Sequence, residues 1–132
     1  IKDYYGAITD YTKAIEINPN DSDVYNNRGN AKTSLKDYYG AISDYTKAIE
    51  INPNDSDAYN NRGNRKVDLK DYYGAISDFT KAIENNPKYA LGFANRGAAK
   101  EDLGDMQGAC DDWRKASYLG DESAAKWVRN QC

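Results

Sequence analysis

The chain has 132 residues with a formal net charge of −3, two cysteines and no histidine. Its acidic balance argues against nucleic-acid binding, which normally requires a basic face, and no apolar run approaches the roughly 18–20 residues of a membrane-spanning helix. Because histidine is absent and two cysteines cannot complete a tetrahedral zinc site, we expect no enzymatic activity, no catalytic residues, no metal and no cofactor.

From Asp3 onward the sequence repeats itself with a period of 34 residues. Asp3–Lys36, Asp37–Lys70 and Asp71–Gly104 align without a gap, and a diverged copy begins at Asp105. Three slots recur with the period: a proline at Pro19, Pro53 and Pro87, and glycines at Gly6, Gly40, Gly74 and Gly108 and at Gly29, Gly63 and Gly97. Such self-similarity predicts a stack of identical supersecondary units.

Residues 1–21 are predicted to contain one helix, over about Asp3–Ile17. This segment aligns with the second half of the following copy, so it corresponds to the second helix of a truncated repeat. We infer that the chain comes from a longer array.

Each following unit is predicted to contain two helices. Asp37 is a good N-cap, and the segment after it, YYGAISDYTKAIEI, has apolar residues at i, i+3, i+4 and i+7. Asn52-Pro53 ends that helix, because proline cannot donate the next helical hydrogen bond. The predicted units are 22–55, 56–89 and 90–121, followed by a C-terminal capping helix at 122–132. Since one helix pair cannot bury its apolar face alone, the pairs are expected to stack into an all-α solenoid, with the glycine inside each first helix allowing close packing.

This pattern resembles the tetratricopeptide repeat family, over nearly the whole chain. In the unit 22–55 the family's slots hold Tyr25, Gly29, Ala41, Tyr45, Ala48 and Pro53. The resemblance implies a right-handed superhelical solenoid of antiparallel helix pairs that acts in protein–protein interaction. Two slots depart from the family pattern: arginine replaces the usual leucine at Arg28, Arg62 and Arg96, and lysine replaces the usual tyrosine at Lys32, Lys66 and Lys100.

The arginines lie on the side of the first helices that packs against second helices, so their charge requires a partner. A carboxylate precedes the aromatic residue of every second helix, at Asp10, Asp44, Asp78 and Asp112. We expect each arginine to form a structural ion pair with an aspartate of its own or the preceding unit. The lysines are expected to lay their stems on apolar surface and keep their charge in water.

The two cysteines lie at equal distances from Asp121, on helices expected to run antiparallel. Cys110 and Cys132 could therefore form a disulfide that pins the last helix; the alternative is a buried free thiol and a frayed terminal cysteine. A disulfide would favour an extracytoplasmic compartment, and the sequence leaves open whether the protein is cytoplasmic or periplasmic.

Polar residues recur along one stripe of each first helix. In the family this stripe lines a concave groove where extended peptides bind. Asn27, Asn61 and Asn95 resemble an asparagine ladder that holds peptide backbone, since an asparagine side chain both donates and accepts hydrogen bonds. The other candidate peptide-binding residues are Asn26, Asn30, Asn60 and Asn64.

The family's rival binding mode is a clamp for a C-terminal carboxylate. Its basic slots here hold Asn26, Asn60, Leu91 and Ala94, so this mode lacks its cations. The carboxylates near the groove instead predict a partner protein with an extended neutral or basic segment, and neither nucleic acid nor membrane as partner. The alternative is a structural module that acts by repeat stacking or self-association: the protein would be a monomer or associate weakly end to end through apolar surface on residues 4–15.

Overall fold

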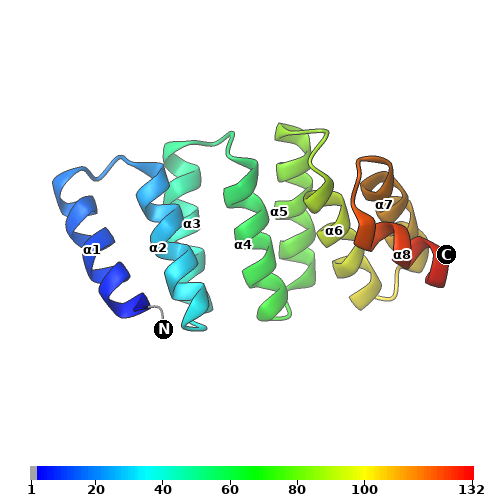
Figure 1. The fold of residues 1–132 in the computed structure, drawn as a ribbon, viewed down its shortest axis with the longest axis horizontal. Helices are drawn as coiled ribbons and strands as arrows, with labels where there is room; N and C mark the ends of the chain where they lie inside the picture. The colour runs from blue at the N-terminus through cyan, green and yellow to red at the C-terminus, as the bar shows by residue number, and fades with distance from the viewer. Residues whose placement is uncertain (1–2) are drawn as a thin grey trace.

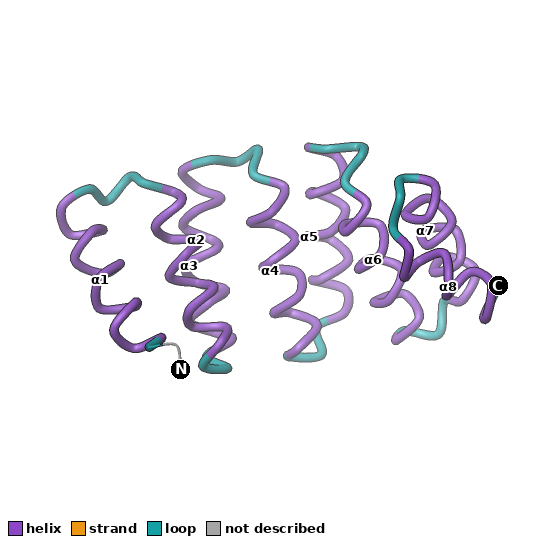
Figure 2. The backbone as a smooth tube through the Cα atoms, viewed as in Figure 1, coloured by secondary structure: helices purple, strands orange, loops and turns teal. Residues whose placement is uncertain are grey.

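Eight α-helices follow one another through the computed structural model, which describes residues 3–132 (Figures 1 and 2). The first two residues of the predicted segment 1–21 therefore lie outside the described residues. The helices are α1 (Tyr4–Ile17), α2 (Ser22–Ser34), α3 (Tyr38–Ile51), α4 (Ser56–Asp68), α5 (Tyr72–Asn85), α6 (Ala90–Asp102), α7 (Met106–Tyr118) and α8 (Glu122–Gln131). Figure 1 shows them side by side along the long axis, with the two termini at opposite ends. No strand occurs between residues 3 and 132, so the all-α solenoid is confirmed.

An aspartate caps the N-terminus of seven of the helices. In the second helices the cap carboxylate accepts a hydrogen bond from the N–H of the recurring glycine, as Asp37 does from Gly40 at 3.0 Å. A Cβ on Gly40 would collide with that carboxylate. The cap thus explains the glycine in the first turn of each second helix. The connections from α2, α4, α6 and α7 to the next helix each contain one residue with a positive φ, at Lys36, Lys70, Gly104 and Gly120.

The core is built mainly from alanines and two large aromatic residues per unit. Tyr45, Phe79 and Trp113 are fully buried. Each ring lies against the glycine inside the first helix of its pair: a Cβ on Gly29 would lie 2.7 Å from Tyr45 Cε1, and a Cβ on Gly97 would lie 2.6 Å from Trp113 Nε1. The expected close packing at the helical glycines is confirmed.

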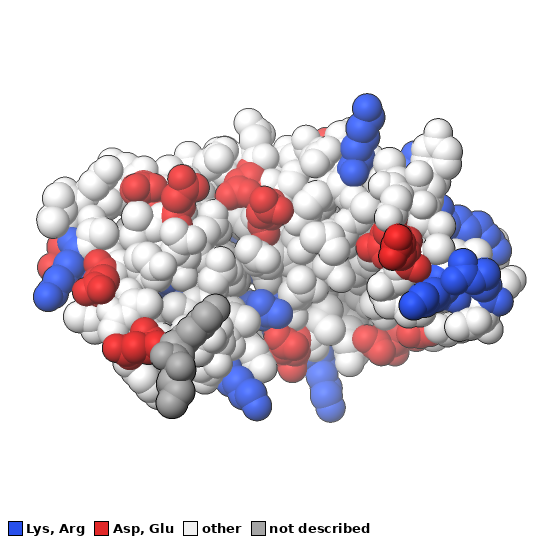
Figure 3. All heavy atoms as spheres, in the orientation of Figure 1, with Lys and Arg blue, Asp and Glu red and all other residues white. Residues whose placement is uncertain are grey.

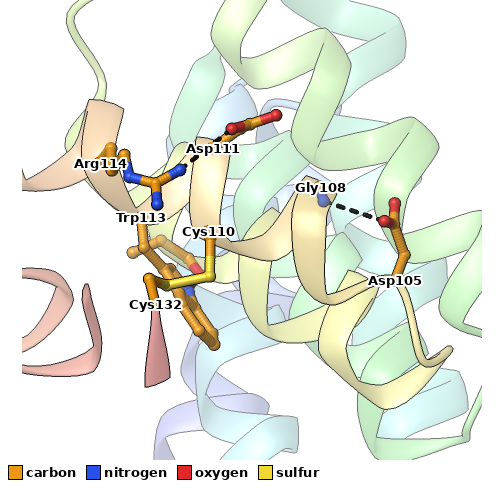
Figure 4. The surroundings of a disulfide bond; sticks show 8 residues. Asp105, Gly108, Cys110, Asp111, Trp113, Arg114 and Cys132 are labelled. Carbon is orange, nitrogen blue, oxygen red and sulfur yellow. Dashed lines mark hydrogen bonds and ion pairs between the residues drawn. A yellow bond between two sulfur atoms is a disulfide. The ribbon is translucent and has the colours of Figure 1, made fainter. Parts of the chain in front are cut away.

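The C-terminal end is closed by α8, which packs on α7. The ring centroids of Trp113 and Trp127 lie 5.4 Å apart. Figure 4 shows Cys110 on α7 pointing toward Cys132 just after α8, and the structure joins them in a disulfide with a Cα–Cα distance of 5.9 Å. In the described part of the chain, no helix has the length and apolar character needed to cross a bilayer.

Candidate functional site

The three recurrent arginines are held inside the stack by carboxylates of their own units. Arg62 donates from Nε to Asp78 Oδ2 at 2.9 Å and from Nη2 to Asp78 Oδ1 at 2.7 Å. Its Nη1 donates to Thr46 Oγ1 at 3.2 Å, so one guanidinium joins three successive helices, α3, α4 and α5. The same contacts occur at Arg28 with Asp44 and at Arg96 with Asp112.

Each buried carboxylate also holds a second cation. Lys66 Nζ lies 3.0 Å from Asp78 Oδ2, and Lys32 and Lys100 repeat this contact at 3.0 and 2.9 Å from their own aspartates. The expectation that the lysines keep their charge in water was wrong, because they lie one helical turn after the arginines and reach the same carboxylate.

Asp10 differs from the other three aspartates of its slot. It is exposed, and no ion pair of Asp10 occurs within residues 3–132. Its inclusion among the ion pairs was therefore wrong for this structure. The paired arginine precedes its aspartate by 16 residues, and no residue of the sequence stands at that distance before Asp10.

The hydrogen bond to the aspartate dominates the electrostatics of these clusters. It raises the pKa of Arg28 and of Arg62 above the ordinary value, although burial acts in the opposite direction. Arg28, Arg62 and Arg96 also lie over the aromatic rings of Tyr25, Tyr59 and Phe93. The arginines are thus occupied by contacts within the stack.

A polar groove runs across the first helices α2, α4 and α6. Its cavity volume is about 720 Å³, and its lining includes Asp23, Asn30, Asp57, Asn61 and Tyr89. No lysine or arginine is among the described residues that line it. Figure 3 shows acidic side chains gathered over the N-terminal ends of α2 and α4. The groove can therefore offer amide groups and negative charge to a ligand.

Asn26 and Asn60, expected as groove contacts, are largely used by the fold. Asn60 is only 5% exposed, and its Oδ1 accepts a hydrogen bond from Asn95 Nδ2 at 2.9 Å. Asn26 donates from Nδ2 to Asp55 Oδ2 at 2.9 Å. The Oδ1 atom of Asn26 is buried and has no hydrogen-bond partner in residues 3–132, which makes it an unused acceptor beside the groove.

The three ladder positions are not equivalent in the structure. Asn61 is half-buried and lines the polar groove, whereas Asn27 is exposed and lines a second hollow between α1 and α2. Neither side chain has a hydrogen-bond partner among the described residues, while Asn95 is tied to Asn60. Asn61 is therefore the ladder residue that combines a groove position with free donors and a free acceptor.

Asn30 and Asn64 differ because the aromatic residue that faces them differs. Tyr45 donates its hydroxyl proton to Asn30 Oδ1 at 2.6 Å. Phe79 takes the place of Tyr45 in the next unit and has no hydroxyl, so Asn64 keeps its amide without a partner in the described part of the chain.

Tyr89, which was not predicted from the sequence, also lines the groove. It takes the N-cap slot of α6, where α2 and α4 have the aspartates Asp21 and Asp55. Its hydroxyl donates to Asp57 Oδ1 at 2.6 Å. Burial raises the pKa of Tyr89, and the bond to Asp57 raises it further. The replacement of the recurring aspartate by tyrosine at position 89 was the feature of the sequence that could have indicated this residue.

Sequence models described as tetratricopeptide repeat match residues 22–55 and 56–89, and one described as TPR repeat matches residues 2–33. The Arabidopsis OM64 TPR domain is 30% identical, with 84% of this chain and 96% of that chain covered and a TM-score of 0.78. The first TPR of Spaghetti (RPAP3), bound to the HSP90 peptide SRMEEVD, is 27% identical, with 82% and 87% covered and a TM-score of 0.78. A crystal structure of MamA is similar in fold, with 21% identity, 96% and 75% covered and a TM-score of 0.89. The comparison with curated protein sequences gives no match.

Proposed function

This chain belongs to the tetratricopeptide repeat family, and from that premise we propose that it is a non-enzymatic scaffold that binds an extended segment of another protein in the groove across α2, α4 and α6. A similar solved structure, the first TPR of Spaghetti, holds a peptide, which supports this class of function. The observation that carries the proposal is Asn61, whose amide has no partner among the described residues and lies in a groove whose described lining contains no lysine or arginine.

The ladder of Asn27, Asn61 and Asn95 binds the peptide backbone. An asparagine amide donates to a peptide C=O and accepts from a peptide N–H, so it holds an extended chain without selecting its side chains. The ladder residues stand on helices, which keep their positions fixed before binding and so lower the cost of ordering. Asn61 contributes most, because its amide is free, and Asn95 must exchange its bond to Asn60 for one to the ligand.

The charge of the groove selects a neutral or basic segment. The peptide held by the Spaghetti domain, SRMEEVD, carries three acidic residues. In this chain the groove instead contains the carboxylates of Asp23 and Asp57, and a C-terminal carboxylate would meet no cation there. Like-charge juxtaposition disfavours an acidic ligand.

A library of extended peptides screened against the full chain tests the ladder. We expect the triple variant Asn27/Asn61/Asn95→Ala to weaken binding of the selected peptides by roughly 10- to 100-fold, from about one hydrogen bond per site. The matched control is the double variant Asn20/Asn130→Ala, which removes exposed amides outside the groove. Equal affinity of the triple variant and wild type would refute the ladder.

Self-association of the repeats remains the alternative function. The half-buried side chains of Tyr4, Ile8, Tyr11 and Ile15 on α1 favour it, because apolar surface at the end of a stack can bind another molecule. Sedimentation over a range of concentrations separates the two: a chain that stays monomeric while it binds peptide supports the scaffold, and a concentration-dependent oligomer that excludes peptide supports self-association.

A further inference from the structure

The three first helices have different residues in one corresponding slot of the groove, which we call the first-turn slot. It holds Asp23 in α2, Asp57 in α4 and Leu91 in α6. All three side chains are exposed and line the same cavity of about 720 Å³. The ladder position is an asparagine in every unit, whereas the first-turn slot changes from acidic to apolar along the groove.

Leu91 contributes little to the fold. It is 52% exposed, and none of the three hydrophobic core clusters of the described residues contains it. An aspartate in this slot interacts favourably with the positive end of the helix dipole, as Asp57 does in α4, but the first turn of α6 has no acidic residue. A single exposed leucine is ordinary on a protein surface, but this one lines a polar groove. Its position therefore points to an apolar side chain of a ligand.

The two aspartates of the first-turn slot keep their negative charge available to a ligand. Neither Asp23 nor Asp57 forms an ion pair among the described residues, and Figure 3 shows acidic side chains gathered at this end of α2 and α4. Tyr89 donates its hydroxyl proton to Asp57 Oδ1 at 2.6 Å, which holds the carboxylate in place without neutralising it. An ammonium or guanidinium group of a ligand can therefore pair with these carboxylates.

The separation of the first helices sets the separation of the ligand's side chains. Helices α4 and α6 contact each other, and helices in contact lie about 8–10 Å apart. A peptide in the polyproline II conformation rises about 3.1 Å per residue with three residues per turn, so its side chains i and i+3 point the same way about 9 Å apart. Every third residue of such a ligand can thus meet the first-turn slot of the next unit.

We propose, on the basis of the peptide-binding function above, that the groove selects the side chains of its ligand through the first-turn slot. The selected segment has basic residues three positions apart, opposite Asp23 and Asp57, and an apolar residue three positions further, opposite Leu91. The ladder holds the backbone of this segment, and the slot sets its register. A shift by one unit would place a charged side chain against Leu91 and an apolar one against an aspartate, which disfavours the wrong register.

The probes are three fluorescein-labelled peptides of nine residues, built from serine. The first has lysine at its second and fifth positions and leucine at its eighth, the second has the reverse order, and the third has lysine at all three positions. The two mixed peptides cover both chain directions. Fluorescence anisotropy with the full chain measures the affinities. We expect one mixed peptide to bind about three- to tenfold tighter than the all-lysine peptide, because its leucine is buried against Leu91.

The variant Leu91→Asp gives α6 the aspartate that α2 and α4 have in the same slot. It should fold, because the other units fold with this residue, and its circular dichroism spectrum checks this. We expect the preference to reverse, so that the all-lysine peptide binds about three- to tenfold tighter than either mixed peptide. The control Tyr118→Asp places the same charge at an exposed apolar position outside the groove lining and should keep the wild-type preference.

The variant Asp57→Asn removes the charge of one slot and keeps a side-chain oxygen for the hydroxyl of Tyr89. At low salt we expect it to weaken binding of the preferred mixed peptide about three- to tenfold. It should have no effect on a peptide whose central lysine is replaced by serine, because the two changes then remove the same contact. The control Glu16→Gln makes the same charge change at an exposed position outside the groove lining and should leave the affinity unchanged.

Two results would overturn this inference while the proposed function stands. One is an unchanged preference in Leu91→Asp. The other is that library peptides bind and depend on the ladder, as shown by Asn27/Asn61/Asn95→Ala, while neither mixed peptide binds tighter than the all-lysine peptide. If no extended peptide binds the wild-type chain, the proposed function and this inference both fail.

Discussion

Replacing Asp78 with alanine should destabilise the protein strongly, because it leaves two cations without their shared anion. Asp78 is 3% exposed, and the side chains of Arg62 and Lys66 are 18% and 23% exposed. Breaking a buried ion pair costs roughly 3–5 kcal/mol. Because both cations keep about a fifth of their surface in water, we expect the lower end, about 3 kcal/mol.

Thermal unfolding followed by circular dichroism measures this effect. With an unfolding entropy of about 2.1 cal/mol/K per residue, 132 residues give roughly 280 cal/mol/K, so about 3 kcal/mol lowers Tm by roughly 11 °C. The control is Asp10→Ala, at the same slot of α1, whose sequence differs from that of α5 at three positions. Because the Asp10 carboxylate is exposed and has no ion pair in residues 3–132, its removal should change stability by no more than about 0.5 kcal/mol. Similar losses in both variants would refute the assignment of this energy to the buried cluster.

Three further predictions concern packing, the disulfide and pH. Gly63→Ala should lower the free energy of unfolding by about 1–3 kcal/mol in urea titrations, because its Cβ would lie 2.7 Å from Phe79 Cε1; an unchanged midpoint would show that the ring can move aside. Reduction of the disulfide, whose cysteines are 22 residues apart, should cost about 3 kcal/mol, and two free thiols in protein denatured without reductant would contradict the bond. Because burial and the bond to Asp57 raise the pKa of Tyr89 above its ordinary value of 10.0, the stability from this group is present below pH 10.0 and is lost as the pH rises above it. Tyr89→Phe should therefore reduce the loss of stability at alkaline pH, and an identical profile for both proteins would count against the shift.

Much of the fold could be predicted from local chemistry in the sequence. The caps at Asp37 and Asp71, the proline after α1, α3 and α5 and the helical apolar period each act within one or two turns of chain, so these features can be read from the sequence of one unit. The site was harder to predict because it depends on side chains from different units. Asn60 and Asn61 are neighbours in sequence and both line the groove, yet Asn60 is buried and accepts a hydrogen bond from Asn95, whereas Asn61 is half-buried and has no side-chain partner among the described residues.

The sequence by itself determined the repeat, the helix pairs and the glycine positions, whereas the structure decided that each arginine pairs with an aspartate of its own unit. Only the tertiary structure decided that the lysines share the same carboxylates, that Asn26 and Asn60 form hydrogen bonds within the fold and that Tyr89 lines the groove. The physical reason is the range of the interactions. A helical pattern repeats every 3.6 residues. The exposure of an amide such as that of Asn60 depends instead on a side chain of the next unit, here Asn95, which is 35 residues away in the sequence. The contrast between Asp10 and Asp44 shows the same rule, since α1 and α3 differ at one residue, yet Asp44 is buried in α3 and no residue of α1 is buried.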